Sequence, residues 1–90
     1  MIILITYDLN KPGKDYSDLY AAIDGLRGSK HHPLESIWLL DTDSTPKQVA
    51  NILKDVIDTN DSLLVIRLQK DYGGWLTQDS WDWLNGRTYY

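Results

Sequence analysis

Cysteine and phenylalanine are both absent from this 90-residue chain, and methionine occurs once. Without cysteine, the chain has no disulfide framework and no thiolate that could bind a metal or act as a nucleophile. Long apolar runs are also missing: the longest, 2–5 and 63–66, fall far short of the ~20 residues of a membrane helix. The opening lacks the basic-then-apolar pattern of a secretory leader, so we expect a cytoplasmic protein.

Positive charge is scarce as well. Thirteen acidic residues face nine basic ones, which gives a formal net charge of −4 and a pI near 4.8. Nucleic-acid-binding proteins draw most of their affinity from basic side chains that contact phosphates, so the composition disfavours an extensive surface of that kind. Four cations close together in the sequence still leave room for a local cationic surface: Lys11, Lys14, Arg27 and Lys30.

The spacing of apolar residues predicts strands that alternate with helices. Strands are expected at 2–9, 29–33, 35–42 and 62–69, and helices at 16–26, 46–57 and 78–85. Asp15 or Ser17 is expected to cap the first helix and Gly28 to end it, and Thr45-Pro46-Lys47-Gln48 reads as a capping box for the second. This order predicts one α+β domain with a ferredoxin-like split βαβ sheet, two helices on one face and a short C-terminal helix.

The predicted sheet has more apolar surface than its helices can cover. The strands at 2–9 and 36–40 are apolar on both faces, whereas the two helices lie on one face only. We divide the chain into a core, 1–70, and an aromatic C-terminal extension, 71–90. Both this extension and a second copy of the chain are expected to cover the other face, which predicts a homodimer.

Three short motifs carry a family resemblance: Leu4-Ile5-Thr6-Tyr7-Asp8-Leu9, Leu34-Glu35-Ser36-Ile37-Trp38 and Asn60-Asp61-Ser62-Leu63. In order and spacing over residues 1–70, the chain resembles the CRISPR-associated Cas-two family, which is related to the virulence-associated protein D toxins. The resemblance implies a small ferredoxin-like homodimer. Look-alikes of this type also occur outside CRISPR loci, so a phage or mobile-element relative is expected as readily as a member of a spacer-acquisition complex. Two features depart from the family pattern, the acidic charge and the C-terminus.

The resemblance also implies a role for Asp8, which matches the aspartate that the family places at the end of its first strand. In the family dimer, two such aspartates approach the two-fold axis and are proposed to hold Mg²⁺. Hard carboxylate oxygens suit that ion, which can activate water and neutralise a phosphodiester. As an alternative, Asp8 simply caps the turn that follows the strand.

Two further groups of residues are candidates for ligand binding. The segment Asn10-Lys11-Pro12-Gly13-Lys14 lies between a strand and a helix, where Asn10, Lys11, Lys14 and backbone N–H groups suit a phosphate. It lacks the glycine spacing of a defined phosphate loop and also fits a solvated loop. Trp75 or Trp83 is expected to be exposed, for stacking on a base or for a protein interface. The alternative for these two tryptophans is packing in the core or at the dimer interface.

The remaining polar pairs have simpler interpretations. His31 and His32 are adjacent on an extended segment and point to opposite faces, so they do not share one metal ion. We expect them to pack at an edge against the tryptophan-rich region rather than to act as a general base. Asp41 and Asp43 precede a helix, where capping and solvation are favoured over metal binding.

Three functions are therefore considered. The first is a homodimer that binds a nucleotide or a nucleic-acid phosphodiester without efficient catalysis. The second is a Mg²⁺-dependent endoribonuclease centred on paired Asp8 residues. The third is a protein-assembly module that uses the tryptophan-rich C-terminus.

Overall fold

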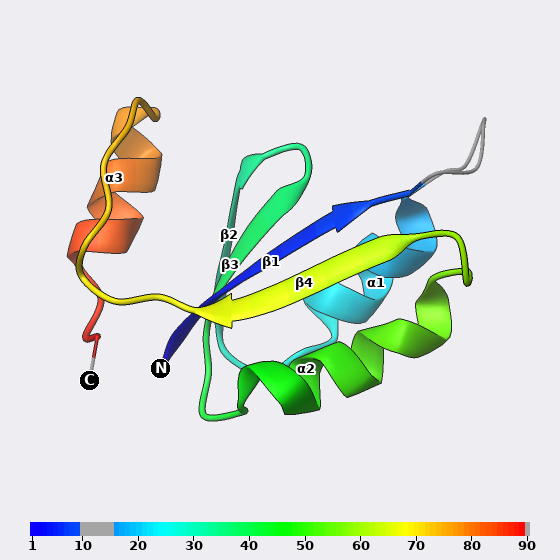
Figure 1. The fold of residues 1–90 in the computed structure, drawn as a ribbon. Coiled ribbons are helices and arrows are strands. Elements are labelled where there is room, and N and C mark those ends of the chain that lie inside the picture. Colours follow the sequence, from blue (N-terminus) through cyan, green and yellow to red (C-terminus); the bar gives the residue numbers. More distant parts are fainter. Residues whose placement is uncertain (10–15, 90) are drawn as a thin grey trace.

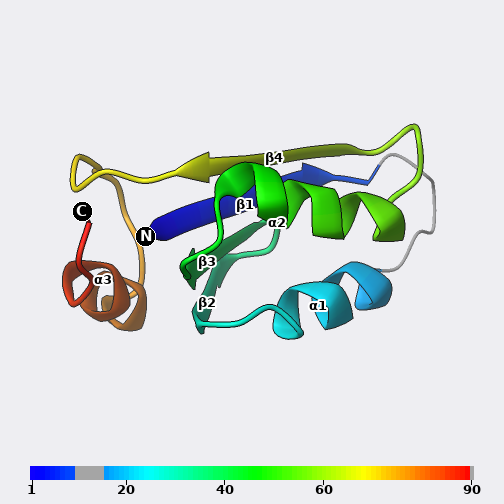
Figure 2. The same cartoon turned by 90° about the horizontal axis from the view of Figure 1, so that it is seen from below.

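The computed structural model describes residues 1–9 and 16–89. Its elements are β1 (Ile2–Asp8), α1 (Ser17–Asp24), β2 (Ser29–Leu34), β3 (Ile37–Asp41), α2 (Pro46–Leu53), the 3₁₀ turn η1 (Lys54–Val56), β4 (Ser62–Arg67) and α3 (Gln78–Asn85). The strands form an antiparallel sheet in the order β2-β3-β1-β4, and α1 and α2 cover one of its faces (Figures 1 and 2). The predicted ferredoxin-like α+β fold with a C-terminal helix is confirmed.

The main core lies between the sheet and these two helices. β1 is central, and Ile5 lies across from Trp38 of β3 on one side and Val65 of β4 on the other. Because side chains alternate along a strand, one set from each strand meets the helices. The buried members of this core are Ile3, Ile5, Tyr7, Leu19, Ile23, Trp38, Leu40, Val49 and Leu53.

The sequence predicted the N-terminal cap of α2 correctly but not that of α1. At α2, Gln48 N–H donates to Thr45 Oγ1 (3.2 Å) and Thr45 N–H donates to Gln48 Oε1 (2.8 Å), so the predicted capping box is confirmed. At α1 the N-cap is Tyr16, which makes no side-chain capping bond. Ser17 is instead the first helical residue, and Asp15, the other expected cap, lies outside the described residues.

The end of α1 corrects the prediction that Gly28 terminates this helix. α1 ends at Asp24, and Gly25 N–H closes it by donating to the Ala21 carbonyl at 3.0 Å. Gly28 is required for another reason: its φ is +118°, and an added Cβ would lie 1.9 Å from the Asp41 carbonyl oxygen. Only glycine has no Cβ to clash there. Gly28 therefore lets the chain enter β2 close against β3.

The apolar stripe expected on the second helix is only partly buried. Val49 and Leu53 are buried, whereas Ile52 is 52% exposed. Ile52 lies about 100° around the helix from Leu53, outside the arc that faces the sheet. After Leu53 the chain tightens into η1, so the regular helical phase assumed for 46–57 does not continue.

One backbone oxygen anchors the turn between β2 and β3. The Glu35 carbonyl accepts hydrogen bonds from Tyr7 Oη (2.8 Å), Tyr20 Oη (3.1 Å) and His32 Nε2 (3.1 Å). His32 also stacks on Trp38 with ring centroids 4.1 Å apart. The turn is thereby tied to β1, α1 and β2 at one point.

Candidate functional site

The side of the sheet opposite α1 and α2 is called the open face here. In β1, the residues pointing to it are Ile2, Leu4, Thr6 and Asp8, because Ile3, Ile5 and Tyr7 belong to the helix-side core. Leu4 lies across from Leu39 and Ile66, and Thr6 across from Ile37 and Leu64. The open face is therefore apolar in its middle and ends at the Asp8 carboxylate.

The C-terminal helix covers the β2 side of the open face. His31, which lies across from Leu39, forms a 2.8 Å hydrogen bond between its Nε2 and Ser80 Oγ of α3. Its ring stacks on Trp83 with centroids 5.9 Å apart, and Trp83 Nε1 donates to Ser29 Oγ at 3.2 Å. The prediction that the C-terminal extension covers part of this face is confirmed.

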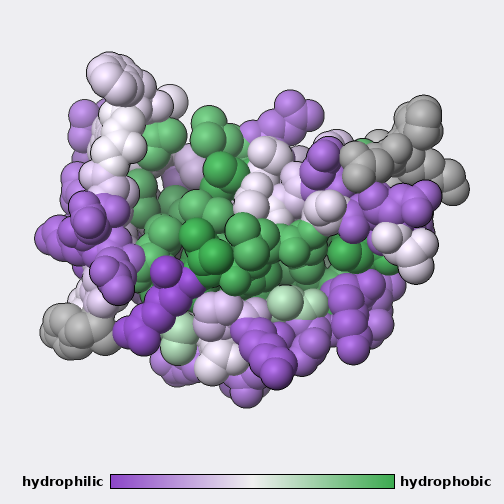
Figure 3. Space-filling view, viewed as in Figure 1, coloured by the Kyte–Doolittle hydropathy of each residue, from purple (hydrophilic) through white to green (hydrophobic). Residues whose placement is uncertain are grey.

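Cover is lost towards β4. Ile2 and Leu39 are buried on the open face, yet Leu64 and Ile66 of β4 are 56% and 40% exposed. Leu64 and Ile66 are named the β4 patch. Figure 3 shows apolar surface along β4 that continues over the strands above it in this view, with more polar surface below. This patch is one part of the open face that the described chain leaves exposed; Leu34 of β2, which lies across from Ile37, is another at 48% exposure.

Asp8 lies at one end of the open face and is exposed. It lies across from Ser62 of β4, beside a depression of about 210 Å³ that is lined by Thr6, Tyr7, Asp8, Ser62, Leu63 and Leu64. Within residues 1–9 and 16–89, no three His, Cys, Asp or Glu side chains gather closely enough to hold a metal ion. Among the described residues of one chain, Asp8 therefore belongs to no cluster of three such side chains.

The expected ligand-binding residues are in different situations. Asn10, Lys11 and Lys14 lie outside the described residues. Trp75 is 97% exposed, on the segment between β4 and α3. Trp83 is partly buried and engaged within the fold, because it stacks on His31 and the Arg87 guanidinium lies 4.6 Å from its ring centroid.

The polar pairs adopt structural roles. His31 and His32 point to opposite faces, as predicted, with His31 against α3 and His32 against Trp38. Asp41 differs from its expected capping role, because it pairs with Arg87 at 3.4 Å and so links β3 to the segment after α3. Local sequence gives no signal for this contact, since the two residues are far apart along the chain and meet only after α3 docks.

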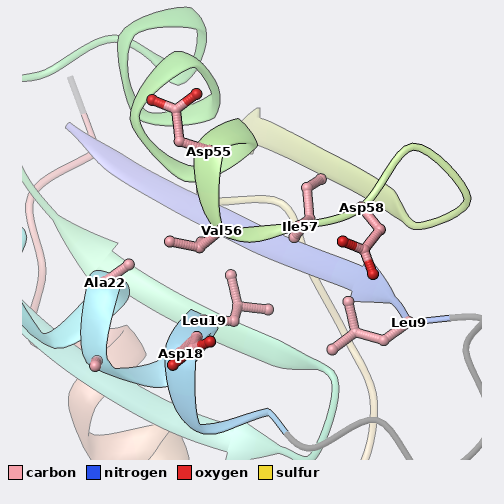
Figure 4. Close-up of a pocket in the computed structure, with 9 residues that line it drawn as sticks. Leu9, Asp18, Leu19, Ala22, Asp55, Val56, Ile57 and Asp58 are labelled. Atoms are coloured by element: carbon pink, nitrogen blue, oxygen red, sulfur yellow. The ribbon is translucent and has the colours of Figure 1, made fainter.

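A cavity lies on the other side of the molecule, between α1 and the α2–η1 segment. It measures about 700 Å³ and is shown in Figure 4. Leu19 and Val56 contribute apolar walls, and the carboxylates of Asp18, Asp55 and Asp58 lie around them (Figure 4). Three acidic groups oppose a phosphodiester, so this cavity does not suit the expected ligand.

No protein-family model and no curated protein matches this sequence. The Cas-two resemblance therefore remains an expectation from three short motifs. None of the helices in residues 1–9 and 16–89 has the length and apolar composition that a membrane span requires.

Proposed function

We propose that this chain works as a homodimer assembled on the β4 patch, and that the dimer binds a nucleotide or a nucleic-acid phosphodiester at the Asp8 end of the open face without efficient catalysis. The observation that carries the proposal is the exposure of Leu64 and Ile66, two apolar side chains on the same face of an edge strand. Burying apolar surface contributes about 25 cal/mol per Å². A second copy can therefore supply burial that a 90-residue domain cannot obtain alone.

The position of the cations supports the ligand half of the proposal. Lys11 and Lys14 come three and six residues after Asp8 in the sequence. The net charge of −4 opposes long-range attraction of nucleic acid, which favours a small ligand or a short segment over an extended duplex. Trp75 follows the Arg67 end of β4, whereas Asp8 lies across from Ser62 at the other end of that strand, so Trp75 has no part in this site.

The dimer is tested with a matched pair of substitutions. Leu64→Glu places a charge on the β4 patch, whereas Leu34→Glu changes a leucine that is 48% exposed on β2, the opposite edge strand. Sedimentation should show a wild-type dimer at micromolar concentration, a Leu64→Glu monomer and a Leu34→Glu dimer. A wild-type monomer would refute the proposal.

Ligand binding is tested by following tryptophan fluorescence and melting temperature while mononucleotides and short single-stranded RNA are added. We expect a salt-sensitive response that the Lys11→Ala/Lys14→Ala variant loses. Lys47→Ala, which removes an exposed cation from α2, should leave the response unchanged. An equal response in all three proteins would reject this site.

The 97% exposure of Trp75 favours a second candidate, a protein-assembly module. Large aromatic side chains are often the residues on which interfaces depend. If dimers form and no nucleotide or RNA binds, a Trp75→Ala variant that loses co-purifying protein partners would support this candidate.

A further inference from the structure

β4 lies at one margin of the sheet, and its single charged residue is Arg67, the last of the strand. The strand reads Ser-Leu-Leu-Val-Ile-Arg, without proline and without a break in its pairing register with β1. Figure 2 shows no described element beyond this edge. Natural sheets normally protect such edges with bulges, prolines, inward charges or covering segments. A regular edge whose middle is apolar and whose one charge lies at the end of the strand is suited to pairing with another strand.

The backbone hydrogen bonds show which groups of β4 point outward. Leu68 N–H donates to the Ile2 carbonyl of β1 at 2.8 Å. Backbone groups alternate in direction along a strand, so Ile66 and Leu64 also direct theirs towards β1. The N–H and C=O groups of Leu63, Val65 and Arg67 consequently point away from the sheet.

We propose that two copies join through their β4 edges, antiparallel about a two-fold axis at Val65, into one continuous eight-stranded sheet. This inference rests on the proposed homodimer and names its geometry. Val65 would pair with Val65 of the second copy, and Leu63 with Arg67. On the open face, Leu64 of each copy would lie directly across from Ile66 of the other.

Side-chain chemistry favours this register. The two β4 patches merge into one apolar cluster of four side chains, and cross-strand apolar pairs stabilise a sheet. Arg67 would lie across from Leu63 of the second copy, so the two Arg67 side chains would not face each other. An axis at Leu64 would instead place Ile66 across from the polar Ser62, and an axis at Arg67 would bring two guanidinium groups together.

The register is tested by disulfide cross-linking, which is selective because the natural chain has no cysteine. Leu64→Cys and Ile66→Cys proteins, distinguished by a tag, are mixed, allowed to exchange and oxidised. Leu64 and Ile66 of the second copy would form a pair without mutual backbone hydrogen bonds, whose Cα atoms lie about 4.5 Å apart, within disulfide range. Two Leu64 residues, or two Ile66 residues, would be diagonal neighbours about 7–8 Å apart, which is too far for a disulfide. We expect the mixed pair to cross-link at least tenfold more than either variant alone, and Leu34→Cys not to cross-link.

Each outcome decides one point. A wild-type monomer in sedimentation would refute both the dimer and its geometry. A dimer in which the mixed pair fails to cross-link, or in which Leu64→Cys cross-links equally well to itself, would refute the edge register and leave the dimer standing.

A second variant pair tests the backbone contribution without placing a thiol in the patch. Arg67→Pro removes an outward N–H but none that bonds to β1, and proline is tolerated at such positions. With the melting temperature as a folding control, Arg67→Pro should raise the dimer dissociation constant at least tenfold over Arg67→Ala. Equal constants for the two folded variants would contradict the edge pairing.

Discussion

Tyr7 connects the core to the β2–β3 turn through a single hydroxyl group. Its ring is buried among Tyr16, Tyr20 and the other core residues, and its hydroxyl donates to the Glu35 carbonyl. Burial raises the pKa of this phenol well above its ordinary value of 10.0, and a hydrogen bond with Tyr20 raises it further. The phenol is therefore held in its protonated, donating form.

This shift predicts a loss of stability in alkali. The unfolded Tyr7 ionises near pH 10, whereas the folded phenol keeps its proton to a higher pH. Its stabilising effect is thus complete below pH 10 and declines as the pH rises above that value. Urea unfolding between pH 8 and pH 11.5 should show a shallower decline for Tyr7→Phe than for the wild type, although Tyr7→Phe starts about 1 kcal/mol less stable. Parallel curves would show that Tyr7 does not contribute to the pH dependence.

At the scale of single elements, the sequence predicted correctly those features that depend on residues close together in the chain. The capping box at Thr45 and the bounds 78–85 of α3 depend on residues within a turn or two, and both were right. The end of α1 was wrong because the role of Gly28 comes from the approach of Asp41, which is distant in sequence. Ile52 fitted the periodicity but not the arc of α2 that contacts the sheet.

The contrast between neighbouring apolar positions of α2 predicts two different outcomes. Leu53→Asp places a charge in the core and should cost about 4 kcal/mol or more, which is comparable with the whole stability of a small domain. Ile52→Asp alters an exposed side chain and should change stability by about 0.5 kcal/mol or less. Thermal unfolding measures both, and similar melting temperatures for the two variants would mean that the helix faces are misassigned.

At the scale of the whole molecule, the sequence predicted the need for cover on both faces of the sheet but not how that cover is divided. The strand pattern correctly indicated an open face, and Asp8 was correctly placed at the end of β1. Whether Trp75 or Trp83 is exposed could not be decided beforehand, because the answer depends on how α3 docks on His31. The pairing of Asp41 with Arg87 is hidden for the same reason.

The Asp8 carboxylate provides the decisive test between a binding dimer and a nuclease. In the proposed register Ser62, which lies across from Asp8, would face Leu68 of the second copy. The two Asp8 carboxylates would then lie far apart, so we expect no efficient cleavage of labelled single-stranded RNA in Mg²⁺ or Mn²⁺. Cleavage that both EDTA and Asp8→Asn abolish would instead establish the endoribonuclease. Cleavage that survives Asp8→Asn would point to a contaminant or to a different site.

The three hydrogen bonds at the Glu35 carbonyl also bear on how this protein can evolve. The turn is held by a main-chain atom, which every amino acid possesses, so the identity of residue 35 contributes nothing to those bonds. The donors Tyr7, Tyr20 and His32 are constrained instead, because each contributes its side chain. These bonds therefore tolerate a change of side chain at position 35 more readily than a change at any of the three donors, so the most replaceable side chain at this turn belongs to the residue at the centre of the contact.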